Sequence, residues 1–166
     1  MFDTHMHCNF SVDAKMTIQQ ATRAAQNRDL GIVITEHMDL DYPTNPLAFV
    51  FDVPEYFAEF GKYRSEKLLL GIELGMQPSV HLQNRAIAQN YDFDMIIGSI
   101  HVAGGIDVYM QRFYQERSKE ESYGIYFADM LACVQAYQDY DALGHIDYIC
   151  RYAPYADTEL EIDAHR

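Results

Sequence analysis

Short apolar runs alternate with amphipathic segments along the 166 residues of the chain. Five runs are apolar and several are rich in β-branched residues, which is typical of strands; they cover residues 1–7, 30–35, 68–74, 94–100 and 142–149. The segments between them predict four helices, over residues 17–28, 52–66, 79–90 and 120–137. Strands that alternate with helices predict a parallel sheet, either an open doubly wound sheet or a (β/α) barrel.

The predicted helices carry recognisable local signals. Thr17 is followed three residues later by Gln20, as in a capping box, and Pro54 stands in the first turn of the second helix. The longest helix shows an apolar stripe, which we expect to face the core. This stripe includes Phe127, Leu131 and Val134.

Composition and charge fit one domain covering residues 1–166. Apolar residues make up 49% of the chain, which is enough for a core, and no run is long enough to cross a bilayer. The three scattered cysteines and the absence of a visible signal peptide indicate a cytoplasmic protein rather than a disulfide scaffold. The formal net charge of −13 argues against nucleic acid and anionic membranes as partners.

Residues of the types that commonly ligate metal ions, histidine and glutamate, stand near the end of every predicted strand. In an extended strand His5 and His7 point to the same face, so their imidazoles can converge on one ion, with Asp3 as a ligand or supporting partner. The carboxyl ends of parallel strands meet on one face, where barrels build their active sites. We therefore expect one pocket shared by the side chains at these strand ends. The further members of the set are His37, Glu73, His101 and His145.

Imidazole and carboxylate ligands suit zinc, manganese or iron, of which we favour zinc. Glu73 lies on the central strand, and the two oxygens of a carboxylate can bridge two ions. Two such ions can hold a hydroxide as the nucleophile and clamp a phosphoryl group. The sequence contains no serine nucleophile elbow, no Walker phosphate loop and no dinucleotide fingerprint. Metal-assisted hydrolysis is the reaction class that remains.

These motifs resemble those of the PHP (polymerase and histidinol phosphatase) superfamily, in the same order and at similar spacing. The segment from Gly144 to Tyr148, followed by Arg151 and Tyr152, looks like the histidinol-phosphatase branch, as does the Glu73–Pro78 segment. The resemblance extends over nearly the whole chain. The shared motifs are Asp3-x-His5-x-His7, Thr35-Glu36-His37, Gly71-Ile72-Glu73 and Ser99-Ile100-His101.

The resemblance implies a distorted, seven-stranded (β/α) barrel with two or three divalent metal ions. It also implies hydrolysis of L-histidinol phosphate to L-histidinol, the phosphatase step of histidine biosynthesis. In that pattern His5, His7 and Glu73 hold one metal, and Glu73 bridges to a second metal. The second metal is also held by His101 and His145. A third metal is held by His37 together with Asp13.

Arg151 is the candidate phosphate clamp because it closely follows the fifth predicted strand. A guanidinium group matches phosphate oxygens with a fork of N–H donors and stays charged at any relevant pH. The alternative interpretation is an ordinary surface arginine. The expected partner is therefore a small phosphorylated metabolite.

The chain departs from the family pattern at its C-terminal end. Family members continue through two further βα units to a Gly-Ser-Asp-x-His motif, whereas this sequence ends at Asp163-Ala164-His165-Arg166 without that context. We therefore expect a barrel with about five of seven units, with two open sheet edges. Such a chain is expected to be poorly active and able to form homo-oligomers.

Other functions stay open at this point. One is a different phosphoesterase of the superfamily, a phosphotyrosine phosphatase or a nuclease, although a nuclease is expected to show a basic track that this acidic chain lacks. Another is a non-catalytic metal-binding remnant.

Overall fold

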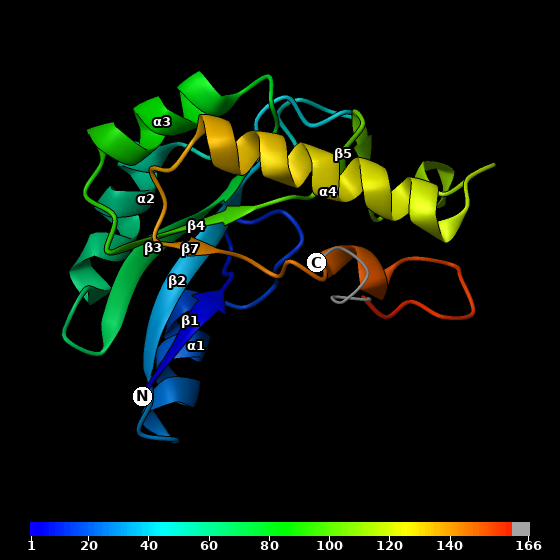
Figure 1. Ribbon diagram of the computed structural model, residues 1–166. Coiled ribbons are helices and arrows are strands. Elements are labelled where there is room, and N and C mark those ends of the chain that lie inside the picture. Colours follow the sequence, from blue (N-terminus) through cyan, green and yellow to red (C-terminus); the bar gives the residue numbers. More distant parts are fainter. Residues whose placement is uncertain (161–166) are drawn as a thin grey trace.

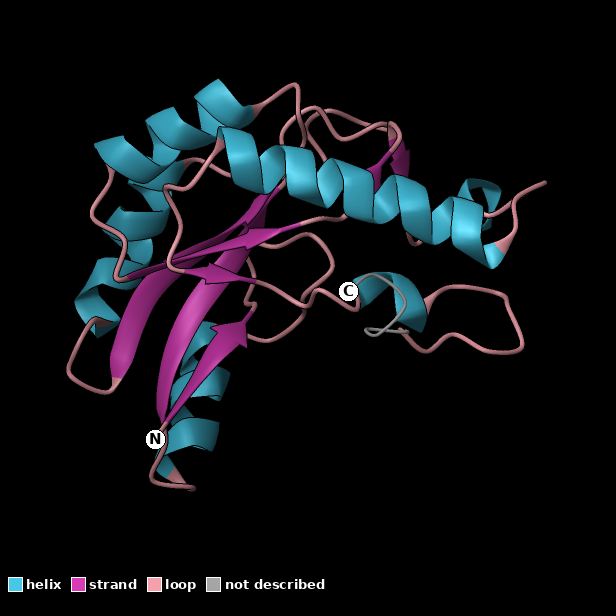
Figure 2. Ribbon diagram, viewed as in Figure 1, coloured by secondary structure: helices cyan, strands magenta, loops and turns pink. Residues whose placement is uncertain are grey.

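The computed structural model describes residues 1–160, so the Asp163 and His165 considered above lie outside the described residues. Five parallel strands form one sheet in the order β1-β2-β3-β4-β7 (Figure 1). Helices lie along the outer side of this sheet (Figure 2). The strands are β1 (Phe2–Met6), β2 (Gly31–Met38), β3 (Leu68–Gly75), β4 (Met95–Ser99) and β7 (Ala142–Leu143). The helices are α1 (Ile18–Gln26), α2 (Val53–Phe60), α3 (His81–Asn90) and α4 (Lys119–Ala136).

Local sequence signals account for most helix starts. Thr17 and Gln20 form the predicted capping box of α1, and Ser118 forms another with Glu121 at the start of α4. The Asp52 side chain accepts a hydrogen bond from the Glu55 backbone N–H and caps α2. Each cap satisfies backbone N–H groups that have no partner inside the helix.

Two apolar clusters hold the helices on the sheet. The first lies between α1, α2, β2 and β3, and the fully buried Tyr56 and Phe60 belong to it. The second packs α4 and the following segment against β3 and the loops after β4. The buried side chains of α4 include Tyr123, Tyr126, Met130 and Cys133. Leu131 of the predicted stripe is instead 58% exposed, so the stripe was placed partly on the wrong face of the helix.

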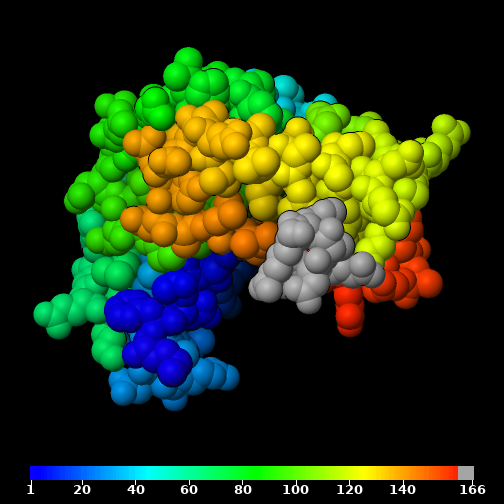
Figure 3. All heavy atoms as spheres, in the orientation of Figure 1, coloured from blue at the N-terminus to red at the C-terminus, as the bar shows by residue number. Residues whose placement is uncertain are grey.

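The sheet curls into a half-barrel, as an incomplete (β/α) barrel requires. The imidazole rings of His5 in β1 and His145 just after β7 come from the two edges of the sheet, yet their centroids are 5.4 Å apart. In the space-filling view the blue N-terminal segment accordingly lies against the orange segment that contains β7 (Figure 3). This curvature turns the strand ends toward one another.

Several element boundaries differ from the prediction. The predicted fifth strand over 142–149 is reduced to the two residues of β7, after which the chain turns into a 3₁₀ helix at Tyr148–Arg151. The predicted helix over 52–66 ends at Phe60, followed by a 3₁₀ turn at Gly61–Tyr63. Pattern reasoning missed an antiparallel hairpin made by β5 (Val102–Ala103) and β6 (Ile106–Asp107), whose turn contains Gly104 and Gly105 with positive φ. Within residues 1–160, no helix is both long and apolar enough to span a membrane.

Candidate metal centre

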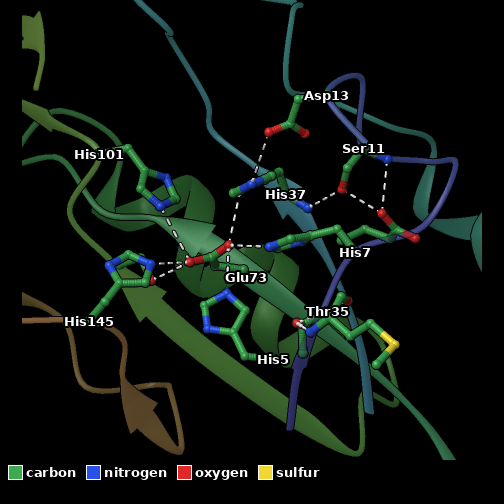
Figure 4. Close-up of polar contacts among 12 residues, drawn as sticks. His5, His7, Ser11, Asp13, Thr35, His37, Glu73, His101 and His145 are labelled. Atoms are coloured by element: carbon green, nitrogen blue, oxygen red, sulfur yellow. Dashed lines mark hydrogen bonds and ion pairs between the residues drawn. The ribbon is translucent and has the colours of Figure 1, made fainter. Parts of the chain in front are cut away.

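A single buried carboxylate, that of Glu73 on β3, stands at the centre of five imidazoles (Figure 4). Its side chain is 0% exposed, and its Oε2 atom faces three histidines. The distances from Oε2 are 3.1 Å to Nε2 of His5, 3.5 Å to Nε2 of His7 and 3.0 Å to Nδ1 of His37.

The other oxygen of the same carboxylate faces a different set of groups. Oε1 of Glu73 lies 2.9 Å from Nε2 of His145 and 3.3 Å from Nε2 of His101. It also accepts a hydrogen bond of 2.6 Å from the hydroxyl of Ser99. The two oxygens of Glu73 therefore divide the histidines between two sides of one carboxylate.

Parallel strands bring these residues together from distant parts of the sequence. His37 and Glu73 lie opposite each other in the register of β2 and β3, and His101 follows the end of β4. The register of β1 shifts between Asp3 and Met6, where the Thr35 hydroxyl accepts a hydrogen bond from the Met6 N–H. All these side chains project from the carboxyl ends of the strands, as the sequence predicts.

A second buried carboxylate fixes the loop that follows β1. Glu36 accepts hydrogen bonds from the backbone N–H groups of Cys8 and Ser11 and from the Ser11 hydroxyl. The Ser11 hydroxyl in turn accepts from the backbone N–H of His37. Burial raises the pKa of Glu36, and these hydrogen bonds lower it in part. Because the Glu36 side chain is used in this way, it holds the loop against β2 rather than facing the centre.

The protonation of the centre follows from burial and neighbouring charge. Burial raises the pKa of Glu73, but hydrogen bonds from surrounding histidines outweigh burial and hold that pKa well below its usual range. Burial, followed by the charge of His37, lowers the pKa of His7 to about 4. Burial also lowers the pKa of His101, but Asp39 and Glu73 outweigh it and raise that pKa well above its ordinary value. Glu73 is therefore an anion and His7 a neutral imidazole at pH 7.

The ligand atoms fit divalent ions on both sides of Glu73. Two atoms bound about 2.0–2.1 Å from a tetrahedral ion are separated by about 3.3 Å. The 2.9–3.5 Å separations of Nε2 atoms from the Glu73 oxygens bracket this value. Oε2 of Glu73 and Nδ1 of His37 are buried without a hydrogen-bond partner among the described residues, although they lie only 3.0 Å apart. A cation between such atoms would satisfy both.

Three groups of side chains present ligand atoms within 4.8 Å of one another. Two of these groups share Glu73 and contain the same residues as the first and second metal sites that the family resemblance implies. The third contains Asp39, a residue that the sequence reasoning missed. Its signal was the spacing of His37-x-Asp39, which repeats the alternation seen at His5-x-His7. The three groups are His5–His7–Glu73, Glu73–His101–His145 and His37–Asp39–His101.

Two acidic residues named from the sequence lie at the margin of the centre. Oδ2 of Asp13 is 3.7 Å from Nε2 of His37, and the Asp13 side chain is 56% exposed. Asp13 therefore reaches the outer side of His37. Asp3 accepts a hydrogen bond from the backbone N–H of His5 and is exposed, so it supports the strand rather than lining the pocket.

The histidines form the floor of a cavity of about 850 Å³. Arg151 lines this cavity at the end of the 3₁₀ helix, and its guanidinium lies 5.5 Å from the ring centroid of Tyr152. Within residues 1–160 the Arg151 guanidinium has no carboxylate partner in an ion pair. The cavity thus combines a carboxylate–imidazole floor with one unpaired cation and an aromatic wall. The aromatic lining residues are Tyr42, Phe49, Tyr148 and Tyr152.

Known proteins are similar to this chain in both sequence and fold. A probable histidinol-phosphatase of Clostridium acetobutylicum is 48% identical over 160 residues, which cover 96% of this chain and 62% of that protein. A histidinol-phosphatase of Lactococcus lactis is 32% identical, covering 99% of this chain and 63% of that protein. The chain therefore spans a little over three fifths of the length of these relatives.

A crystal structure superposes closely on the described fold. It is histidinol phosphate phosphatase from Lactococcus lactis, complexed with zinc, L-histidinol and phosphate, with a TM-score of 0.88 and 32% identity. The match covers 96% of this chain and 63% of that one, which confirms the predicted barrel type. The sequence model of the PHP domain matches residues 3–165. The chain therefore belongs to the PHP domain family.

Proposed function

We propose that this chain forms the metal-binding part of a phosphomonoesterase that hydrolyses L-histidinol phosphate to L-histidinol and phosphate. The proposal is supported by two relatives named as histidinol-phosphatases and by a similar structure complexed with zinc, L-histidinol and phosphate. Two or three divalent ions, zinc in the first place, are the proposed cofactors. The substrate class is a small phosphorylated metabolite.

The division of five histidines between the two oxygens of Glu73 carries this proposal. His5 and His7 offer Nε2 atoms to one side of the carboxylate, and His101 and His145 offer theirs to the other. Such an arrangement suits two ions bridged by one carboxylate. A third ion is proposed beside His37, with Asp13 as its carboxylate ligand.

Bound divalent ions would lower the pKa of water and neutralise charge on phosphoryl oxygens. The chain's own residues would bind and orient the substrate. Arg151, which lacks an ion-pair partner among residues 1–160, would hold the phosphate by charge-assisted hydrogen bonds. The faces of Tyr148 and Tyr152 on the cavity wall would pack against the imidazole ring of the substrate.

The direct test is phosphate release by the natural protein that contains this sequence. We expect the zinc-loaded protein to hydrolyse L-histidinol phosphate much faster than phosphotyrosine or a dinucleotide phosphodiester, and chelation to abolish the reaction. Normal turnover after metal depletion, or equal rates with all three substrates, would contradict the proposal. Phosphodiester hydrolysis alone would instead support a nuclease.

The cellular setting is part of the same proposal. All three cysteines, Cys8, Cys133 and Cys150, are free thiols in the structure, which suits a reducing compartment such as the cytoplasm. The net charge of −13 disfavours nucleic acid as a partner.

Replacing Arg151 tests the phosphate clamp. We expect Arg151→Ala to weaken inorganic phosphate binding to the zinc-loaded protein by about 1.5–3 kcal/mol, or roughly 10–150-fold, because charge-assisted hydrogen bonds are lost. Arg151→Lys keeps the charge but not the planar fork, so it should restore only part of the affinity. Titration calorimetry with phosphate measures both values.

The control for this series is Arg28→Ala, a change of the same type just after α1, remote from the cavity lining. It should leave phosphate binding unchanged. An Arg151→Ala variant with the phosphate affinity of the parent protein would remove Arg151 from the proposed site.

A further inference from the structure

We propose that Asp39 is a positioning residue that fixes the ring of His101, so that Nε2 of His101 faces the second metal position. This inference rests on the proposed metal centre and goes beyond it, because Asp39 contacts the centre only through histidines. The Asp39 side chain is 3% exposed, and its Oδ1 atom lies 2.7 Å from Nδ1 of His101.

The distance identifies this contact as a hydrogen bond rather than a pair of ligands on one ion. At 2.7 Å it is shorter than all of the 2.9–3.5 Å separations between Nε2 atoms and the Glu73 oxygens, and well below the roughly 3.3 Å that separates two ligands on a tetrahedral ion. Nδ1 of His101 therefore donates a hydrogen bond to Asp39. This leaves Nε2, at 3.3 Å from Oε1 of Glu73, as the nitrogen that would release its proton and offer its lone pair when a metal binds.

His101 differs in this respect from other histidines of the centre. The Nδ1 atoms of His7 and His145 are buried without a hydrogen-bond partner in the described part of the chain. Apart from the contacts of their Nε2 atoms with Glu73, these rings are held by packing, for example by the stacking of His7 on His37. A carboxylate that holds Nδ1 fixes both the tautomer and the orientation of an imidazole. Asp39 thus gives His101 a restraint that His7 and His145 lack.

The surrounding backbone is shaped to hold Asp39 in this position. The Asp39 backbone N–H donates to the carbonyl of Phe49, which anchors the residue after β2. On the neighbouring strand, Gly75 leaves the space that the carboxylate fills. A Cβ atom at Gly75 would lie 2.6 Å from Cγ of Asp39 and would overlap Oδ1. Gly75 has no positive φ, so the need for glycine here comes from the Asp39 side chain.

The experiment is a cobalt titration of the metal-free 166-residue chain, followed by the visible absorption of bound Co²⁺. We expect Asp39→Ala to weaken Co²⁺ binding at one position by about 10–100-fold and to change its absorption spectrum. Asp39→Asn should lose less affinity, because the amide oxygen can still accept from Nδ1. Gly75→Ala should weaken Co²⁺ binding at the same position. The double variant should bind Co²⁺ no more weakly than Asp39→Ala does.

Asp41→Asn is the matched control, since Asp41 is an exposed aspartate two residues further on. It should bind Co²⁺ as the parent chain does. Thermal unfolding of the Asp39→Ala chain separates positioning from general stability. If Asp39 has a purely structural role, the melting temperature of the metal-free chain should fall. If it positions His101, the rise in melting temperature that metal binding causes should become smaller.

Two outcomes would overturn the inference in different ways. A parent chain that binds Co²⁺ and an Asp39→Ala chain with the same affinity and spectrum would refute the role of Asp39 and leave the proposed function intact. A parent chain that takes up no Co²⁺ would refute the metal centre and this inference together.

Discussion

Glu73→Gln is expected to abolish tight metal binding on both sides of the centre at once. The glutamine side chain keeps the shape of glutamate but offers one uncharged carbonyl oxygen instead of two anionic ones. Because His5 and His7 share one oxygen of Glu73 and His101 and His145 share the other, both ligand sets lose their carboxylate. The loss should exceed the roughly 10–100-fold that removal of an outer partner costs. Zinc content after dialysis measures it.

The control for Glu73 is Glu66→Gln, a change of an exposed glutamate just before β3. It should retain the full zinc content of the parent chain. A single-histidine variant, His145→Ala, should lose one ion and retain another. If Glu73→Gln also loses only one ion, the carboxylate is not shared between two metals.

Tyr56→Ala is expected to have the largest effect on folding. Tyr56 is fully buried, and its hydroxyl donates to the carbonyl oxygens of Ile34 and Gly71, on β2 and β3. Removing a buried aromatic ring lowers the free energy of unfolding by about 3–5 kcal/mol. The loss of a hydroxyl shared by two carbonyls adds to this. Urea denaturation of the metal-free chain measures the change.

Two comparisons separate the contributions of Tyr56. Tyr56→Phe keeps the ring and should lower the free energy of unfolding by only about 1–3 kcal/mol, the range for hydrogen-bond groups left without a partner. Tyr109→Ala, at a tyrosine that is 58% exposed, should cost about 1 kcal/mol or less. Equal losses for Tyr56→Ala and Tyr109→Ala would show that the cluster around α2 does not support the sheet.

The order of strands and helices follows from the sequence because it depends on short, local signals. The apolar runs that form β2 and β3 and the capping box at Thr17 are such signals. The length of β7 could not be predicted in this way. The pairing of β7 with β4 covers Ala142 and Leu143, and the Gly144 N–H still donates to the carbonyl oxygen of Gly98. A Cβ at Gly144 would overlap the Ser99 hydroxyl that bonds Glu73, so the chain passes β4 too closely here for any residue but glycine. This close approach is a tertiary contact, which a local sequence pattern does not reveal.

The site shows the same division between local and distant information. The strand-end rule predicted that the five histidines and Glu73 gather in one place, because each stands at or just after the end of a parallel strand, with His5 and His7 sharing β1. Sequence reasoning missed Asp39 because its contact with the metal centre is made through His101, which lies 62 residues away in the sequence. The stretch around it also contains Asp41 and two prolines, which is typical of a loop. Apart from the His37-x-Asp39 spacing, only the three-dimensional contact with His101 distinguishes Asp39 from a solvated charge.

Anomalous diffraction from crystals of the zinc-loaded chain, recorded on both sides of the zinc absorption edge, tests the central claim most directly. The structure predicts one peak beside Oε2 of Glu73, near Nε2 of His5 and His7. It predicts another beside Oε1, near Nε2 of His101 and His145. A map with no peak within bonding distance of Glu73, or with zinc bound only elsewhere, would contradict the shared metal centre.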